Sequence, residues 1–194
     1  MGQALTRLSL QEFLDWENDQ PERHEFHRGE VFAMVGARRV HGTIALNIAA
    51  SLKSQLKGSR CQVFADSMKV RVAADTIFYP DVFVTCDAAD LRTEQVFTAP
   101  SLVVEVLSPS TELWDRNGKF TLYRSLASLR EYLLVHPDTR EVHLFRRGAD
   151  ELFTLHDLTG RERVQLDSIG CELLAIDVFD GVDPAAEQPA SLPG

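Results

Sequence analysis

The sequence predicts an α/β fold of the mixed α+β kind, and three observations lead to that prediction. The chain has 194 residues, which suits a single domain and is long enough to bury a core. Its hydrophobic and charged fractions, 44% and 25%, are those of an ordinary globular protein. Segments with apolar residues at helical spacing alternate along the chain with short β-branched runs. This interleaving predicts a mixed sheet flanked by helices.

The N-terminal part of the chain predicts a helix, a hairpin and a second helix. Ser9 and Glu12 form a capping box that starts a short amphipathic helix. The segment EFHRGEVFAMV, residues 25–35, alternates apolar and polar residues around an Arg-Gly turn, which predicts a β-hairpin. Apolar residues at helical spacing then predict a helix over 41–57 with its apolar face on a sheet.

Short apolar runs bounded by turn residues predict most of the strands. They lie at 61–65, 68–73, 77–86, 102–107, 131–137, 141–148 and 151–156, with an apolar end segment at 171–179. A further helix is predicted at about 115–126. We place a single domain at 1–180 and predict that the tail 181–194, which lacks an apolar pattern, is disordered.

Composition excludes several classes of protein. Acidic residues outnumber basic ones by 29 to 20, and the net charge of −9 argues against a general binder of polyanions. The cysteines Cys61, Cys86 and Cys171 are far apart and form no CxxC pair. They predict neither a disulfide framework nor a structural zinc site, and they favour a reducing cytoplasm. We expect no signal peptide and no membrane-spanning segment.

Glu105 lies inside the apolar run LVVEVL, residues 102–107, which reads as a buried strand. An unpaired ionised carboxylate there costs several kcal/mol or more, or else stays protonated. A cation, a metal ion or a solvent-filled cleft must therefore compensate Glu105. The structural alternative is an ion pair with an arginine such as Arg71 on a nearby strand.

Two further residues suggest a hydrolytic site around this carboxylate. Asp81 follows Pro80 at the start of an apolar strand, and Lys119 lies on the helix after the strand of Glu105. Two acids at the end of one sheet repel unless a cation lies between them, and oxygen ligands suit Mg²⁺ or Mn²⁺. Such a metal and a lysine are suited to hydrolysis of a phosphodiester. Taken singly, Asp81 reads as a turn residue and Lys119 as a solvated one.

An ordered run of segments carries a resemblance to a known family. The segments are HEFHRGEVFAMVG, VHGTIALNIAASL, VFADSMKVRV, YPDVFV, SLVVEVLSPST, DRNGKFTLY and EYLLVHP. Together they resemble the Uma2 family of restriction endonucleases, within the PD-(D/E)XK nuclease superfamily, over roughly residues 5–150. The resemblance implies a restriction-endonuclease-like mixed sheet flanked by helices. It also implies a Mg²⁺-dependent endonuclease that acts on DNA, although RNA cleavage would use the same chemistry.

The resemblance also implies roles for individual residues. Asp81 matches the acid of the PD motif and Glu105 the acid of the (D/E)XK motif, and both would hold the metal together with the backbone carbonyl of Val106. The motif lysine should follow two residues after Glu105, on the same strand face, but that position is Leu107. In this branch the lysine is displaced to the following helix, where Lys119 matches it.

Three more residues are candidates of a second tier. Glu25 matches the acid of the first strand pair and would reach the metal through water, although a surface salt bridge is the plainer interpretation. His41 opens the second predicted helix, either facing the cleft or capping the helix. Asp66 lies in the matching FADSMKV segment and offers a further carboxylate.

The expected partners follow from this reading. A homodimer suits an enzyme that cuts two antiparallel strands, and the protein is expected in the cytoplasm, away from membranes. The alternative from another class is a non-catalytic nuclease-fold module for binding or regulation. The acidic net charge favours that alternative slightly, and the presence of Asp81, Glu105 and Lys119 together weighs against it.

Overall fold

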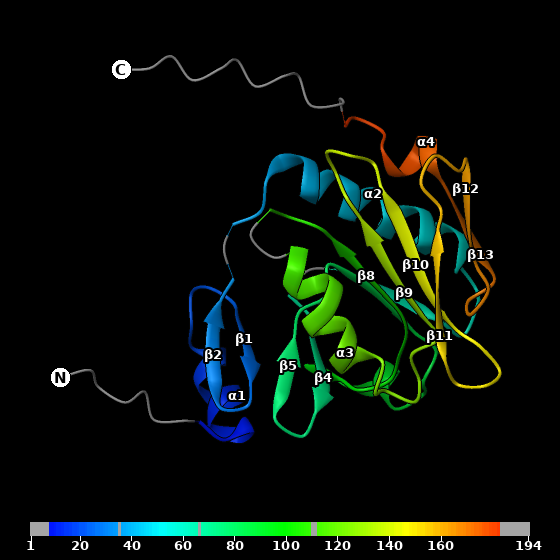
Figure 1. The fold of residues 1–194 in the computed structure, drawn as a ribbon. Helices are drawn as coiled ribbons and strands as arrows, with labels where there is room; N and C mark the ends of the chain where they lie inside the picture. Colours follow the sequence, from blue (N-terminus) through cyan, green and yellow to red (C-terminus); the bar gives the residue numbers. More distant parts are fainter. Residues whose placement is uncertain (1–7, 35, 66, 110–111, 183–194) are drawn as a thin grey trace, which may run out of the picture.

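The computed structural model describes residues 8–34, 36–65, 67–109 and 112–182. It confirms the predicted fold class, because mixed β-sheets are flanked by helices (Figure 1). Asp66 lies outside the described residues, and so does nearly all of the tail that is predicted to be disordered.

A six-stranded sheet forms the centre of the molecule, with the strand order β11-β10-β9-β8-β6-β3. Its strands are β3 (Gln62–Ala65), β6 (Val82–Thr85), β8 (Pro100–Val106), β9 (Glu131–Val135), β10 (Val142–Arg147) and β11 (Phe153–Asp157). The sheet is mixed because β8 and β9 pair in parallel, whereas the other described neighbours are antiparallel. Each of these strands overlaps a run that the sequence predicts to be extended, although β8 begins two residues earlier and β11 ends one residue later than predicted.

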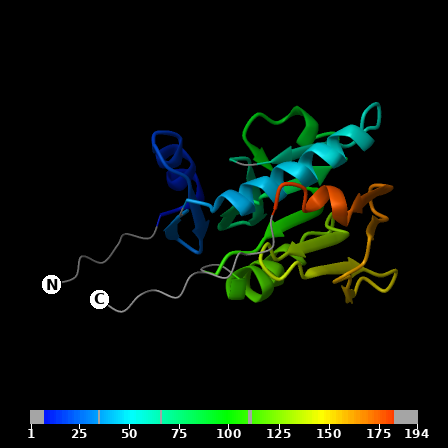
Figure 2. The same cartoon turned by 90° about the horizontal axis from the view of Figure 1, so that it is seen from above.

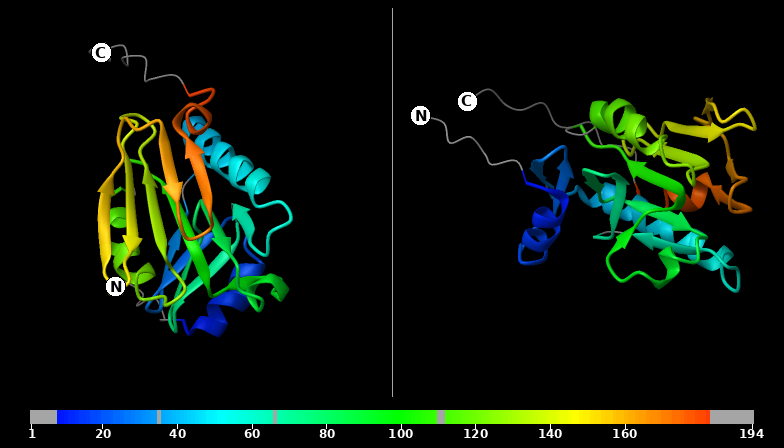
Figure 3. Two further views of the ribbon diagram at one scale, coloured as in Figure 1. Left: turned by 90° about the vertical axis from the view of Figure 1, so that its right-hand side faces the viewer. Right: turned by 90° about the horizontal axis from the view of Figure 1, so that it is seen from below.

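A five-stranded sheet, in the order β2-β1-β5-β4-β7, lies beside the first. Its strands are β1 (His24–His27), β2 (Glu30–Ala33), β4 (Lys69–Ala73), β5 (Thr76–Phe78) and β7 (Val96–Phe97). The predicted hairpin is confirmed, with Arg28 and Gly29 both at positive φ in its turn. The predicted capping box starts α1 (Leu10–Asn18), and α1, β1 and β2 form one end of the molecule (Figure 3).

One predicted strand is wrong in a way that matters for the site. The run 77–86 is not continuous, because β5 ends at Phe78 and β6 begins at Val82. Pro80 between them has no N–H to donate to a ladder, so the chain leaves one sheet and enters the other. Asp81 therefore lies at the corner where the two sheets meet.

Helices cover both faces of the six-stranded sheet (Figure 2). On one face, Ile44 of α2 (Arg39–Gln55) packs among alternate β8 residues such as Val104. The other face packs against the segment predicted as a helix over 115–126. Its first part is a π-helical turn, Trp114–Lys119, and its second part is α3 (Phe120–Tyr123). None of the helices in the described ranges is long and apolar enough to cross a membrane.

The C-terminal part forms a two-stranded hairpin beside α2 (Figure 3). It consists of β12 (Arg163–Leu166), β13 (Cys171–Leu174) and the short helix α4 (Ala175–Val178). A short 3₁₀ turn, Asp90–Arg92, precedes β7. The sequence predicts only an apolar end segment over 171–179, so β12 is an addition from the structure.

The prediction for the cysteines needs a correction, because Cys61 and Cys86 form a disulfide. The physical reason is the register of β3 and β6, in which Gln62 lies opposite Thr85. Cys61 and Cys86 are the next residues outward on the two antiparallel strands, which brings them together although 25 residues separate them in the chain. Cys171 is a free, buried thiol.

Candidate active site

A cleft of roughly 540 Å³ opens where the two sheets meet, at the carboxyl end of β8. Its lining includes four carboxylates and a lysine that gather around the end of β8: Glu25, Asp81, Glu105, Asp115 and Lys119. They come from β1, the corner between β5 and β6, β8 and the π-helical turn. The fold therefore gathers at one point residues that are up to 94 positions apart in the sequence.

Asp81 is held by two hydrogen bonds. The backbone N–H of Val106 donates to Oδ2 at 2.7 Å, and Nε2 of His41 lies 2.9 Å from Oδ1. These contacts join the corner between the sheets to the end of β8 and to the first turn of α2. Asp81 is thus more than a turn residue, since both carboxylate oxygens bind groups from other elements.

Glu105 is only 3% exposed and points to the face of β8 that packs against the π-helical turn. Its compensating cation is Lys119, whose Nζ lies 3.7 Å from Oε1. Arg71, the partner considered from the sequence, is an exposed residue of β4. Burial raises the pKa of the Glu105 carboxyl well above its usual range, although Lys119 opposes that shift. Oε1 has no hydrogen-bond partner among the described residues.

Lys119 pairs with three of the four carboxylates that line the cleft. Its Nζ lies 2.8 Å from Glu25 and 3.3 Å from Asp115, and 5.5 Å from the centre of the Phe78 ring. Burial alone would lower the pKa of this ammonium. The surrounding carboxylates, Glu105 first among them, outweigh burial and raise the pKa well above its usual range. Lys119 therefore remains charged at neutral pH.

The second-tier candidates Glu25 and His41 are both at this cleft. Glu25 is largely buried and pairs with Lys119, so it is not the surface salt bridge considered as an alternative, and burial raises its pKa. Burial alone would lower the pKa of His41, but its hydrogen bond with Asp81 and the charge of that carboxylate raise it. His41 does not cap its helix, because the N-cap residue of α2 is Arg38. Its Nδ1 is buried without a hydrogen-bond partner among the described residues.

Asp115 is the site residue that sequence reasoning missed. It is 3% exposed, its Oδ1 faces Lys119, and its backbone carbonyl accepts a hydrogen bond from the Tyr132 hydroxyl at 2.9 Å. A signal was available, because Asp115 and Lys119 are four residues apart on a predicted helix and opposite charges at that spacing lie together. The sequence pattern predicts Asp115 only as the start of a helix.

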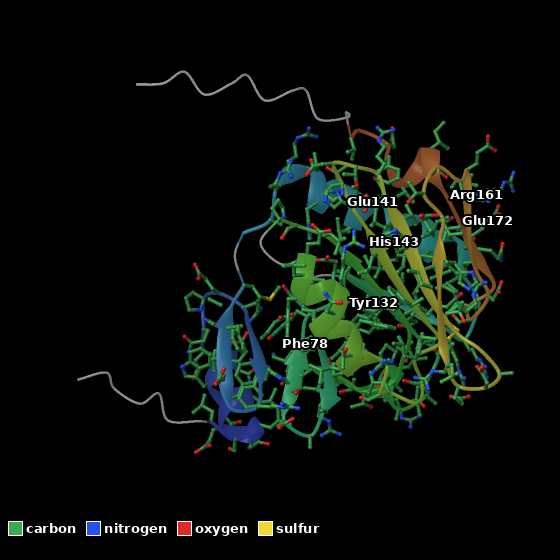
Figure 4. The ribbon with its side chains drawn as sticks, viewed as in Figure 1. Phe78, Tyr132, Glu141, His143, Arg161 and Glu172 are labelled. Carbon is green, nitrogen blue, oxygen red and sulfur yellow. A yellow bond between two sulfur atoms is a disulfide. The ribbon has the colours of Figure 1, made fainter. Side chains whose placement is uncertain are left out.

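Aromatic rings form the buried wall behind the cluster. The ring of Tyr123 lies 5.6 Å from each of the rings of Phe78 and Tyr132, and Figure 4 shows the two labelled residues on either side of α3. Burial raises the pKa of both tyrosines well above the usual range. This apolar wall keeps water from one side of Glu105, which strengthens every charge interaction in the cleft.

The balance of charge bears on whether a metal fits here. Four carboxyl groups, the Lys119 ammonium and the Arg38 guanidinium line the cleft, and Oε1 of Glu105 has no hydrogen-bond partner among the described residues. In the described part of the chain, no group of three or more His, Cys, Asp or Glu residues is arranged to hold an ion. The described residues therefore do not form a complete set of protein ligands around an ion. Two carboxylates and a backbone carbonyl do suit Mg²⁺, which usually keeps several waters and takes few protein ligands.

The mixed sheet, with Glu105 near the end of its central strand β8, fits the restriction-endonuclease-like fold that the sequence resemblance implies. A solved structure from Anabaena variabilis, described as a putative nuclease belonging to DUF820, has the same fold with a TM-score of 0.74. The alignment covers 90% of this chain and 99% of that one at 19% identity. Residues 10–177 match the Uma2 family, described as "Putative restriction endonuclease", and the chain belongs to that family. The resemblance found in the sequence is confirmed.

Two relatives from Synechocystis sp. support the same assignment. Uncharacterized protein slr1290 is 38% identical over 174 residues, covering 89% of this chain and 91% of the relative. Uncharacterized protein sll1609 is 31% identical over 156 residues, covering 79% and 88%. The similarity therefore extends over nearly the whole domain and not over a short motif.

Proposed function

We propose that this protein is a Mg²⁺- or Mn²⁺-dependent endonuclease that hydrolyses phosphodiester bonds in DNA, acting as a homodimer. The observation that supports it most is the excess of carboxylate at the end of β8, where Oε1 of Glu105 has no hydrogen-bond partner in the part of the chain that the structure describes. Membership of the Uma2 family, described as "Putative restriction endonuclease", supports this reaction class. A two-fold pair of sites suits cleavage of two antiparallel strands.

In this proposal Asp81, Glu105 and the backbone carbonyl of Val106 hold the metal ion. When bound, the ion polarises a phosphoryl oxygen and lowers the pKa of a water ligand. His41 fixes the orientation of the Asp81 carboxylate through its hydrogen bond at 2.9 Å, which is the usual role of a residue behind a metal ligand. Glu25 would contact the bound ion through a water molecule.

Lys119 is the proposed electrostatic group of the reaction. Because its pKa is raised well above the usual range, it is an ammonium at neutral pH and is unsuited to take a proton from water. It stabilises the negative charge that develops on the phosphoryl oxygens in the transition state. Its pairing with Glu25 and Asp115 holds the ammonium at the cleft before substrate arrives.

The test is cleavage of supercoiled plasmid and of labelled oligonucleotides by purified protein with Mg²⁺, with Mn²⁺ and with EDTA. We expect metal-dependent products that disappear in Glu105→Gln and Asp81→Asn. Glu172→Gln is the matched control, because Glu172 is a paired carboxylate on β13, outside the residues that line the cleft. Metal-independent products, or cleavage that persists in both site variants, would overturn the proposal.

One observation favours a second candidate, a non-catalytic binding module with a nuclease fold. The described residues offer no ready group of three metal ligands, and three of the four carboxylates already have Lys119 as a partner. Under that candidate neither metal changes the melting temperature, and no nuclease activity survives purification to homogeneity.

A further inference from the structure

The mouth of the cleft carries large apolar side chains that remain exposed to solvent. Phe32 of β2 is 48% exposed, Met34 just beyond β2 is 36% exposed, and Trp114 of the π-helical turn is 40% exposed. All three line the same cleft as Glu105 and Lys119. Exposed apolar side chains that gather at a cleft commonly mark a binding site.

The Trp114 ring is held in place rather than loosely attached. A Cβ on Gly118 would lie 2.0 Å from Cε3 of Trp114, so the indole rests directly against the glycine one turn later. The ring also meets Phe78 edge-on, with ring centres 6.3 Å apart, and His27 at 5.9 Å. A fixed aromatic ring that keeps 40% of its surface exposed is a platform on which another flat ring can stack.

The charges of the cleft do not suit the backbone of an intact duplex. Among the described residues that line it, the only cationic side chains are Arg38 and Lys119. Asp138 binds both terminal nitrogens of Arg38, at 2.6 and 2.9 Å, and Lys119 is buried among carboxylates. Duplex recognition normally neutralises several phosphates with Lys and Arg, and this cleft offers few cations for that.

We infer that the cleft takes an unpaired nucleotide whose base stacks on the exposed rings of Trp114 and Phe32. Base stacking needs no cationic side chain and tolerates any base, so it suits an acidic protein with an aromatic cleft mouth. The substrate class is then single-stranded DNA or an unpaired segment within a duplex, in place of the two paired strands on which the argument for a homodimer was based. This inference rests on the proposed function, since it places the scissile phosphate of that nucleotide beside Glu105 and Lys119.

Fluorescence anisotropy tests the inference without relying on cleavage. The probes are a labelled single-stranded oligonucleotide, the same sequence as a blunt duplex, and a duplex with an unpaired bulge, all with Ca²⁺ in place of Mg²⁺. We expect the single strand and the bulge to bind at least about tenfold more tightly than the blunt duplex. Trp114→Ala and Phe32→Ala should each weaken single-strand binding by about five-fold or more, while Trp114→Phe retains most of it.

Leu155→Ala is the matched control, because Leu155 is 51% exposed on β11 and does not line the cleft. Melting temperatures of all variants establish that each one folds. Equal affinity for single strand and blunt duplex, or ring variants that bind like the control, would overturn the inference even if the protein cuts DNA. Conversely, ring-dependent binding without cleavage under any metal would contradict the proposed function and leave the stacking site standing.

Discussion

The backbone N–H of Val106 donates a hydrogen bond of 2.7 Å to the carboxylate of Asp81. Val106 follows Glu105 directly, so this bond fixes the corner between the two sheets against the strand that carries the second acid. The two candidate metal ligands are thereby held in a set relationship before any ion binds. Preorganisation of this kind is what a hydrolytic site requires.

This bond predicts different costs for two changes at the same position. Asp81→Ala removes the acceptor of a largely buried N–H, so the free energy of unfolding should fall by about 1–3 kcal/mol. Asp81→Asn keeps an acceptor oxygen and should cost about 1 kcal/mol or less, although metal binding is lost. Urea denaturation of the metal-free proteins measures both. Equal losses in the two variants would show that the N–H bond is not the main contribution.

Metal binding should raise the melting temperature, because an ion relieves the repulsion among the carboxylates in the folded state only. At a hundred times its dissociation constant, a bound ion adds about 2.7 kcal/mol to the free energy of unfolding. Thermal scans with and without Mg²⁺ or Mn²⁺ measure the effect. The shift should vanish in Glu105→Gln and persist in Glu172→Gln. An equal rise in melting temperature in Glu105→Gln would show that the ion binds outside this cleft.

Glu105→Gln should leave the metal-free fold intact or stabilise it, because it removes a charge from an apolar strand.

The free energy of unfolding should also depend on pH through Glu105. Since burial raises the folded-state pKa of Glu105 above the unfolded value of about 4.3, the carboxyl stabilises the fold when protonated and loses that contribution as pH rises. Wild-type stability should therefore decrease relative to Glu105→Gln as pH rises from about 4.3 through the raised pKa. Chemical denaturation across pH measures the difference, and a large loss in the variant at every pH would instead identify a structural ion pair.

Lys119→Ala should abolish metal-dependent cleavage and leave metal binding largely in place, since the lysine is not a ligand. It should also destabilise the metal-free protein by about 3–5 kcal/mol, because buried carboxylates lose their cation. Activity assays, metal titration and denaturation measure the three quantities. Asp115→Asn in the Lys119→Ala background should recover part of the lost stability without restoring activity. Lys119→Arg should retain little activity, because the guanidinium has a different shape from the ammonium. Full activity in Lys119→Ala contradicts the role.

Leu107→Lys in the Lys119→Ala background tests whether the lysine is displaced from the strand. Leu107 is buried beyond the end of β8 and belongs to the same hydrophobic cluster as Val103, on the face of Glu105. An ammonium there would approach Glu105 from its own strand, so partial recovery of cleavage is expected. The single variant Leu107→Lys serves as the control for any loss of fold. No recovery in a folded double variant would count against a shared position for the two lysines.

The sequence by itself determined the class of fold and the central acid of the site. Side chains alternate with a period of two along a strand, so Val103, Glu105 and Leu107 had to share one face whatever the rest of the chain did. The same local rules predicted the hairpin at Arg28 and the capping box at Ser9. The ordered motifs around Glu105 were specific enough to indicate the family.

Only the tertiary structure decided which groups surround that acid. The break of a predicted strand at Pro80, the approach of Glu25 to Lys119 and the pairing of Cys61 with Cys86 depend on how the two sheets meet and on strand register. Local spacing carries no information about contacts between positions so far apart in the chain. The π-helical turn likewise places Trp114 against Gly118 at the cleft mouth, where a regular helix was predicted. The chemistry of Glu105 follows from these long-range contacts, because burial and neighbouring charges set its pKa.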